Sequence, residues 1–290
     1  MSEYTIERDV AGPWSLGTSR AFWEGFAPAA LGERPGDDPV LRTVFVAERD
    51  WTTVTAVVRQ DGATARLTLT GDGDLPAAAI QTARFLALDV DAREWPAVGD
   101  RDPVIGAAQR KLPGLRPCGF HSPYEAAAWA VLSQRLRIVQ AARLRADLIA
   151  RHGEDGAFPA PARLRDLELD LPGRKTEYLR AVAEAALDGV LDGGGLRDLD
   201  APAAIAQVRQ IKGLGPFAAE LVVLRGANHP DAVPSHEARL DAEITEQYGS
   251  GVTLATVSPA WRPFRTWAAV HLRALREERT HEIAGPHQEI

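Results

Sequence analysis

The sequence predicts an α+β domain with an antiparallel sheet, followed by a mainly α-helical domain. In the first hundred residues, polar and apolar side chains alternate over short runs, which is typical of half-buried strands. An Asp61–Gly62 pair between two such runs is a strong hairpin signal. From about residue 103 onward, the apolar residues recur at helical spacing instead. We therefore expect an α+β domain at residues 1–100 and an all-helical domain at 101–290.

The first domain is expected to hold three strands and two helices. Leu67 and Leu69 alternate with polar neighbours, and the hairpin joins their strand to a second one at 51–59. The remaining elements expected here are a strand at 41–49 and helices at 15–26 and 76–88.

The second domain opens with a helix that carries its own start signal. Ser122 is followed by Pro123 and Glu125, a capping box with proline at the first helical position. This helix is "PYEAAAWAVLSQ", and the next one, "RIVQAARLRADLIARH", ends at Gly153. Further helices are expected at 175–188, 201–210, 216–227, 236–247 and 260–277. Trp261 and Trp267 recur at helical spacing, so we assign them to the core.

Composition narrows the function classes. Among 290 residues, 45% are apolar and 25% are charged, an ordinary globular balance. The single Cys118 excludes a disulfide framework and a cysteine-based zinc site. No signal peptide or membrane-spanning run is visible, so we expect a cytoplasmic protein without a membrane partner. The net charge of −7 argues mildly against a protein that coats nucleic acid nonspecifically. A local cationic face would still suffice to bind phosphates.

A glycine-rich turn stands between two of the predicted helices. Gly213 and Gly215 flank Leu214, and two glycines permit a tight turn with positive φ and a close approach by another backbone. The N–H groups at the start of the helix that begins at Pro216 would face outward, where they can bind a phosphate. Taken alone, the same pattern also fits a plain connection between helices.

The longer context resembles the helix-hairpin-helix DNA glycosylase superfamily, and most closely its DNA-3-methyladenine glycosylase II group. The run "IKGLGPFAAELVVLRG", followed by "HPDAVPSHEARL", is similar to that family's hairpin and to the helix start that carries its catalytic aspartate. "GLRPCGFHSPYEAAAWAVLSQ" is similar to a further family segment, and the resemblance covers most of the chain. It implies that the helical domain is a glycosylase domain with its helix-hairpin-helix at about 201–227.

The resemblance also implies a function. A base inside a duplex cannot be reached, so such an enzyme flips the nucleotide into a pocket. We expect a monofunctional DNA glycosylase that hydrolyses the N-glycosidic bond of alkylated, 3-methyladenine-like bases in base excision repair. Relatives that also cleave the strand have a lysine where this chain has Phe217, so no Schiff base can form there. The implied partner is double-stranded DNA containing damaged bases, bound by a monomer that is nucleoid-associated in the cytoplasm.

Glu237 occupies the position of the family's catalytic aspartate. An ionised carboxylate there would stabilise the cation that develops on the sugar, and no other acidic residue has the right place. A first-turn glutamate behind an N-cap at Ser235 would also be favoured by the helix dipole alone. The exchange of aspartate for glutamate, with a pocket poorer in aromatic residues, motivates an alternative function: a non-catalytic damaged-DNA-binding protein on the same scaffold.

The resemblance assigns a base pocket to Phe217, Leu221 and Arg273. Only Phe217 keeps an aromatic side chain at these positions, and Arg273 either pairs with a carboxylate or faces solvent. His236, beside Glu237, is expected to be exposed, and Asp231 is expected to cap a helix or form a salt bridge.

DNA binding is assigned by the same resemblance to the hairpin and to the end of the helix that begins at Pro123. Arg135 would fill the gap left by the flipped base, or it is an ordinary exposed arginine. The resemblance implies no required cofactor, but it implies a monovalent cation, Na⁺ or K⁺, held by the backbone carbonyls of Ile211 and Leu214. The residues expected to bind DNA are Gly213, Leu214, Gly215, Phe217, Gln134 and Arg135.

Overall fold

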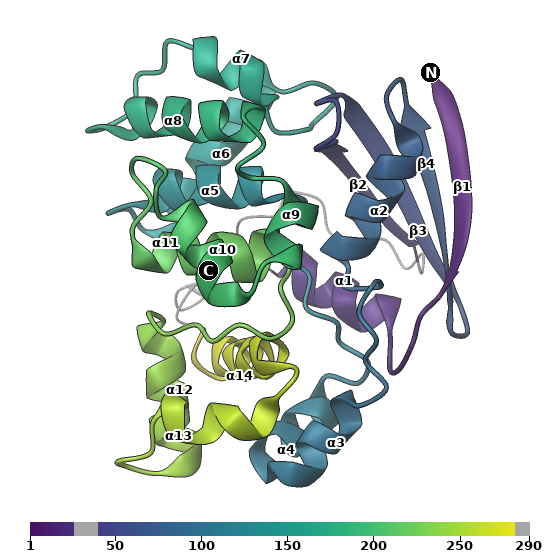
Figure 1. The fold of residues 1–290 in the computed structure, drawn as a ribbon, viewed down its shortest axis with the longest axis vertical. Coiled ribbons are helices and arrows are strands. Elements are labelled where there is room, and N and C mark those ends of the chain that lie inside the picture. The colour runs from purple at the N-terminus through teal and green to yellow at the C-terminus, as the bar shows by residue number, and fades with distance from the viewer. Residues whose placement is uncertain (26–39, 282–290) are drawn as a thin grey trace, which may run out of the picture.

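A computed structural model describes residues 1–25 and 40–281 of the chain. A four-stranded antiparallel sheet in the order β1-β4-β3-β2 forms one side of the molecule (Figure 1). The three predicted strands are present, and Gly62 adopts the left-handed conformation in the β3–β4 hairpin. The strand bounds are β1 (Ser2–Asp9), β2 (Val40–Val46), β3 (Thr53–Asp61) and β4 (Thr64–Gly71).

The edge strand β1 was not predicted. Six of its eight residues, "SEYTIERD", are polar, and seven of the eight are exposed, so no apolar face marks the strand in the sequence. Its backbone pairs along its whole length with β4, from Ser2 opposite Gly71 to Asp9 opposite Thr64. Backbone hydrogen bonds, rather than side-chain burial, therefore define this strand.

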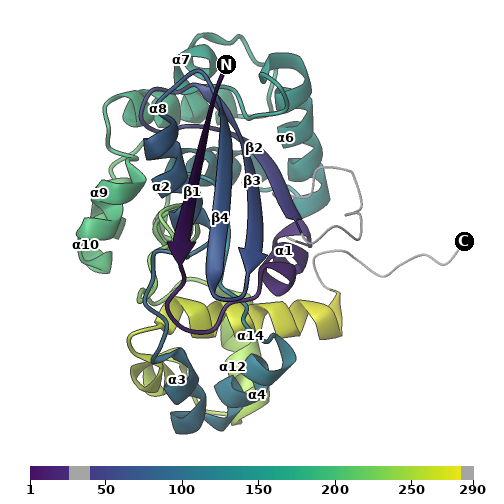
Figure 2. The ribbon, with the colours of Figure 1, turned by 90° about the vertical axis from the view of Figure 1, so that its right-hand side faces the viewer.

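Two helices, α1 (Leu16–Glu24) and α2 (Leu75–Phe85), pack with one face of the sheet, and together they form the first hydrophobic core. Figure 2 shows the sheet in front of the helical layers. Both helices were predicted, although position 26 of the predicted range 15–26 lies outside the described residues. The side chain of Ser15 begins α1 by accepting a hydrogen bond from Thr18 N–H at 3.1 Å.

The middle of the chain forms a second core, built from helices and the loops between them. As predicted, Ser122 caps the central helix, and its Oγ accepts a hydrogen bond from Glu125 N–H at 3.1 Å. The elements are α5 (Pro123–Ser133), α6 (Ile138–His152), α7 (Pro161–Asp166), α8 (Lys175–Leu187), α9 (Gly193–Asp198), α10 (Ala201–Val208), α11 (Pro216–Leu221) and a π-helical segment, η1 (Val222–Gly226). The helices α7 and α9 were not predicted, because six residues are too few to show helical periodicity.

A third core joins the first half of the chain to its carboxyl-terminal helices. Trp261 and Trp267 are fully buried in it, which confirms their assignment to the core. The elements are α3 (Trp95–Arg101), α4 (Pro103–Lys111), α12 (Ala238–Tyr248), α13 (Leu254–Val257), a 3₁₀ turn η2 (Ser258–Trp261) and α14 (Arg265–Thr280). The helix α3 lies across residue 100, and the division into domains at that point stays a prediction.

A buried charged cluster connects the sheet to α5. Glu125 on α5 accepts a hydrogen bond from the Arg145 guanidinium at 2.6 Å and lies 3.3 Å from Nδ1 of His121. The other ring nitrogen of His121 lies 2.7 Å from the Thr43 hydroxyl on β2. Burial raises the pKa of Glu125, but His121 and Arg145 outweigh burial and lower this pKa to about 2.

We predict that this cluster stabilises the fold in a pH-dependent way. Since the pKa of Glu125 lies below its ordinary value of 4.5, the ionised carboxylate stabilises the protein above that pH, and the stabilisation is lost as the pH falls toward 2. Glu125→Gln should lower the free energy of unfolding at neutral pH by about 3 kcal/mol, because it leaves Arg145 buried without its carboxylate. The variant should also lose less stability than wild type between about pH 5 and about pH 3.

Urea unfolding at several pH values measures both effects. Asp91→Asn is a matched control for the loss of one carboxylate charge, because Asp91 forms an exposed ion pair with Arg93, and this variant should keep nearly the stability of wild type. Equal stability of Glu125→Gln and wild type at neutral pH would show that the cluster does not stabilise the fold.

Candidate active site

The hairpin between α10 and α11 has the predicted tight turn, but its two glycines differ. Gly213 has φ of +93°, and a Cβ added there would lie 2.4 Å from Cγ of Tyr178. Gly215 has φ of −82°, so the expectation of positive φ holds for Gly213 only. Apart from Gly215 itself and its two neighbours along the chain, no atom of the described residues lies within 4 Å of a Cβ added at Gly215. The turn therefore requires glycine at 213, whereas Gly215 leaves the surface open to an approaching molecule.

A residue that follows α5 holds this hairpin in place through a hydrogen bond. The Gln134 side chain donates a hydrogen bond from Nε2 to the Gly213 carbonyl at 2.7 Å. Lys175 Nζ donates to the carbonyls of Val131 and Gln134, both at 2.8 Å, which closes the last turn of α5. Burial, followed by the positive charge of Arg135, lowers the pKa of Lys175. The predicted DNA-binding residues at 134, 213 and 215 thus lie on one connected surface.

Arg135 follows Gln134 in a strained conformation. Its φ is +57°, and its side chain is exposed. A residue other than glycine is uncommon in this left-handed region, and such strained positions concentrate at functional sites. The structure therefore places an exposed arginine at the tip of the turn that contacts the hairpin.

A cavity of about 680 Å³ opens between α1, α5, α11, α12 and α14. Four residues assigned from the sequence line it together: Glu237, Phe217, Leu221 and Arg273. They come from three separate helical segments and are up to 56 positions apart, yet they surround one space. Gln134 and Arg135 are outside this lining and belong to the hairpin surface.

Glu237 begins the helix α12 and does not lie inside its first turn. The helix starts at Ala238, and Oε1 of Glu237 accepts a hydrogen bond from Arg239 N–H at 3.2 Å. The predicted N-cap at Ser235 is therefore wrong; its hydroxyl donates to the Val233 carbonyl at 3.4 Å. The two oxygens of a carboxylate offer about four lone-pair positions, so the cap leaves Glu237 able to act on a ligand.

Glu220 fixes the residue before Glu237. This buried carboxylate on α11 accepts from His236 N–H at 3.0 Å and lies 2.7 Å from Nδ1 of the same histidine. The ring of His236 is about half exposed, in agreement with the sequence. Because both contacts are made to one residue, Glu220 sets the position at which the chain enters α12.

A second anchor holds the preceding loop against α14. Asp231 accepts hydrogen bonds from the Arg265 guanidinium at 2.8 and 2.9 Å and from Arg265 N–H at 3.1 Å. This confirms the expected salt bridge of Asp231. The Thr266 hydroxyl adds a 3.1 Å hydrogen bond to the Ala232 carbonyl. The loop that carries Glu237 is therefore attached at both of its ends.

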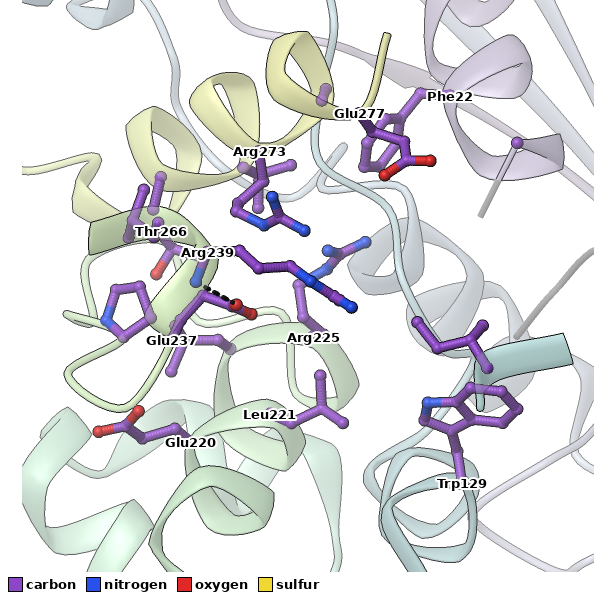
Figure 3. A pocket seen from close by; sticks show the side chains of 18 of the residues that line it. Phe22, Trp129, Glu220, Leu221, Arg225, Glu237, Arg239, Thr266, Arg273 and Glu277 are labelled. Atoms are coloured by element: carbon purple, nitrogen blue, oxygen red, sulfur yellow. Dashed lines mark hydrogen bonds between the residues drawn. The ribbon is translucent and has the colours of Figure 1, made fainter. Parts of the chain in front are cut away.

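Three arginines line the cavity beside Glu237. Figure 3 shows the guanidinium groups of Arg225, Arg239 and Arg273 close to one another in the cavity, on the side to which Glu237 also contributes its carboxylate. Arg225 donates to the Cys118 carbonyl at 2.7 Å and lies over the Phe22 ring, 5.4 Å from its centroid. Burial is the main reason that the pKa of Arg225 is lowered to about 10, so this arginine stays charged at neutral pH.

Sequence reasoning missed several lining residues. Three further carboxylates, those of Glu220, Glu277 and Glu278, also line the cavity, and the expectation that only Glu237 can act on the sugar stays a prediction. Asp241 is exposed and is not part of the lining. Arg225 and Arg239 lie in the segments that carry the resemblance, close to Glu237 along the chain. This closeness in sequence was the signal that could have assigned them to the site. The lining residues not predicted include Phe22, Trp129, Glu220, Arg225, Arg239 and Glu277.

The chemistry available in the cavity is that of carboxylates, guanidinium groups and aromatic rings. Lysine is absent from the described residues that line it, so they offer no amine for a Schiff base. Across residues 1–25 and 40–281, no group of three or more His, Cys, Asp and Glu side chains could hold a metal ion. Within the same ranges, no helix is both long and apolar enough to span a membrane.

Comparison with known sequences finds DNA repair enzymes, although no protein-family profile matches the chain. The chain is 30% identical over 215 residues to the Mycobacterium tuberculosis probable bifunctional transcriptional activator/DNA repair enzyme AlkA, a match that covers 69% of this chain and 42% of that protein. It is 29% identical over 184 residues to DNA-3-methyladenine glycosylase 2 of Escherichia coli, covering 58% of this chain and 62% of the relative. The match therefore spans less than half the length of the first relative.

Solved structures share the fold over nearly the whole chain. A 3-methyladenine DNA-glycosylase from Archaeoglobus fulgidus matches with a TM-score of 0.71 and 18% identity, over 97% of this chain and 99% of that one. A Clostridium acetobutylicum 8-oxoguanine glycosylase/lyase, solved with double-stranded DNA, matches with a TM-score of 0.63 and 14% identity, over 95% and 98%.

In fold and in sequence, the chain resembles the helix-hairpin-helix DNA glycosylase superfamily. Within that superfamily it resembles the DNA-3-methyladenine glycosylases, as the sequence predicted.

Proposed function

We propose that the chain is a monofunctional DNA glycosylase that releases alkylated, 3-methyladenine-like bases in base excision repair. One observation carries the proposal: the Glu237 carboxylate lines the same cavity as Phe217, Leu221 and Arg273. The cavity volume of about 680 Å³ is within the usual range for small-molecule sites, and a purine would fit in it. The relatives named as DNA-3-methyladenine glycosylases support the same reaction.

In the proposed reaction, the protein acts on both groups joined by the glycosidic bond, the base and the sugar. The damaged nucleotide leaves the duplex, and its base enters the cavity between Phe217 and Leu221. As the bond breaks, its electron pair leaves with the base, and positive charge develops on the sugar. The ionised Glu237 stabilises this charge, and water then adds to the sugar carbon and loses its proton. With no amine at 217, the products are a free base and an intact strand with an abasic site.

DNA would be held at the hairpin surface. A phosphate would approach at Gly215, where the surface is open, while Gly213 keeps the turn tight. The Leu214 and Ile211 carbonyls are hard oxygen donors, which fit the implied monovalent cation, and this cation would add positive charge beside the phosphate. Arg135 would enter the gap in the duplex, and the partner would be double-stranded DNA bound by a monomer.

The two glycines are predicted to respond differently to substitution. Gly213→Ala should lower the free energy of unfolding by about 1–2 kcal/mol or more, because it places a side chain at positive φ against Tyr178. Gly215→Val should leave stability nearly unchanged but weaken binding to an abasic-analogue duplex by about tenfold, because the side chain occupies the phosphate position. Thermal melting and fluorescence anisotropy measure the two effects. Unchanged DNA affinity of a folded Gly215→Val protein would contradict the assignment of the hairpin.

The proposed function is tested by incubating the purified chain with a methylated duplex. We expect free methylated purines in solution and a strand that stays intact until alkali cleaves it at the abasic sites. The second candidate, a non-catalytic damaged-DNA binder, is favoured by the glutamate at 237, whose extra methylene changes the position of the carboxylate. Tight binding to damaged duplexes without any base release would support the binder and contradict the enzyme.

A further inference from the structure

The turn that follows α5 adopts a conformation that its sequence does not favour. The Leu136 N–H group donates to the Ser133 carbonyl at 3.2 Å and closes a four-residue turn. Gln134 has φ of −55° and ψ of 122°, and Arg135 has φ of +57°. These angles are those of a type II turn, in which the position of Arg135 favours glycine or asparagine. An arginine is strained there, so a contact from outside the turn has to stabilise it.

Lys175, the first residue of α8, makes this contact. Its buried side chain donates a hydrogen bond from Nζ to the Gln134 carbonyl at 2.8 Å. Type I and type II turns differ by a flip of the central peptide, and the Gln134 carbonyl belongs to that peptide. The hydrogen bond therefore favours the orientation in which Arg135 takes a positive φ. A second hydrogen bond, to the Val131 carbonyl at 2.8 Å, joins the same ammonium group to the last turn of α5.

The first turn of α8 also supports the hairpin. The Tyr178 ring lies against Gly213, where an added Cβ would be 2.4 Å from Cγ of the tyrosine. The Gly213 carbonyl accepts the 2.7 Å hydrogen bond from the Gln134 side chain. Next to it, the Glu177 carboxylate lies 2.5 Å from Lys212 Nζ. One helical turn thus fixes the hairpin and the turn after α5 relative to each other.

We propose that Lys175 is a positioning residue for base flipping: it directs Arg135 into the gap in the duplex without contacting DNA itself. The proposal rests on the proposed glycosylase function, and it explains how one buried amine fixes the direction of an exposed side chain. Without a donor at position 175, the central peptide can flip, and Arg135 can relax to the negative φ of a type I turn. Its Cα–Cβ bond then points elsewhere, and the gap is filled less well.

Lys175→Met tests the proposal, because methionine keeps most of the apolar stem and loses the three N–H donors. Base release is measured in single turnover, at saturating protein, on a duplex with one 7-methylguanine beside 2-aminopurine. The 2-aminopurine fluorescence rises when its neighbour leaves the stack, so it reports flipping separately from bond cleavage. We expect release to be slower by about 10- to 100-fold, as in Arg135→Ala, with a smaller fluorescence rise. Affinity for an undamaged duplex should stay nearly unchanged.

A double variant distinguishes positioning from a purely structural role. Lys175→Met combined with Arg135→Ala should be no slower than Arg135→Ala alone, because no arginine remains to be directed. Lys111→Met is the matched control, since it makes the same substitution at an exposed lysine on α4, and it should release base at the rate of wild type. Thermal melting of each variant separates loss of positioning from loss of fold.

A folded Lys175→Met protein with the release rate and fluorescence rise of wild type overturns the proposal and leaves the glycosylase function standing. Losses that add in the double variant do the same. If Lys175→Met does not fold, Arg135→Gly should still melt at least about 2 °C higher than Arg135→Ala, because glycine fits the positive φ. Equal melting of these two variants then overturns the proposal. A wild type that raises the fluorescence without releasing base overturns the glycosylase function, and the fluorescence alone then tests the role of Lys175.

Discussion

Glu237→Gln is expected to abolish base release, with a loss of about 100-fold or more in the single-turnover rate. Glutamine keeps the length and shape of the side chain, and its carbonyl oxygen can still accept the 3.2 Å hydrogen bond from Arg239 N–H. The helix α12 should therefore begin as before. What the variant lacks is the negative charge that stabilises the sugar cation as the base departs.

The affinity of Glu237→Gln for an abasic-analogue duplex is the control measurement for this variant. On the proposed function, an abasic-analogue duplex would contact the hairpin surface without needing the charge of Glu237, so its affinity should be nearly unchanged. Full excision activity in Glu237→Gln would remove Glu237 from the mechanism. A parallel loss of DNA affinity and of base release would indicate that Glu237 acts in binding.

Glu220→Ala is expected to produce the second largest loss, about 10- to 100-fold in the rate of base release, without contact between Glu220 and the sugar. The buried carboxylate makes two contacts to His236, the neighbour of Glu237. Without them, the start of α12 can shift, and a displacement near 1 Å costs about 100-fold in a well-aligned reaction. We therefore propose that Glu220 is a positioning residue.

Two variants distinguish positioning from general damage. Glu220→Gln should recover most of the rate, because its amide can still accept from His236 N–H and can donate to the imidazole. His236→Ala should have a smaller effect than Glu220→Ala, since the backbone hydrogen bond at 3.0 Å survives. The maximal rate should fall while affinity for the abasic analogue stays constant. A Glu220→Gln variant as slow as Glu220→Ala would contradict this role.

The sequence was informative wherever local patterning decides structure. Three strands, the Asp61–Gly62 hairpin and the Ser122 cap follow from side-chain alternation and turn chemistry, and the structure confirms them. The edge strand β1 could not be predicted, because its pairing with β4 depends on backbone groups that carry no sequence signal. The short helices α7 and α9 depend on packing against their neighbours rather than on their own periodicity.

The sequence predicted only part of the candidate site, because some of its residues come together only through tertiary packing. The resemblance supplied Glu237, Phe217, Leu221 and Arg273, and the fold brings all four to one cavity. Trp129 and Phe22 reach the same space from α5 and α1, and no local pattern links them to α12. The Glu220–His236 contact likewise joins residues 16 positions apart through a loop whose path depends on tertiary anchors.

The measurement that tests the central claim most directly is the single-turnover release of methylated purines by wild type, Glu237→Asp and Glu237→Gln, at equal concentrations on one methylated duplex. The account predicts release by wild type, release by Glu237→Asp at a similar or higher rate, and a loss of about 100-fold or more in Glu237→Gln. Wild type and Glu237→Asp that both bind the duplex yet release nothing would contradict it, and the chain would then be a damaged-DNA binder on a glycosylase scaffold.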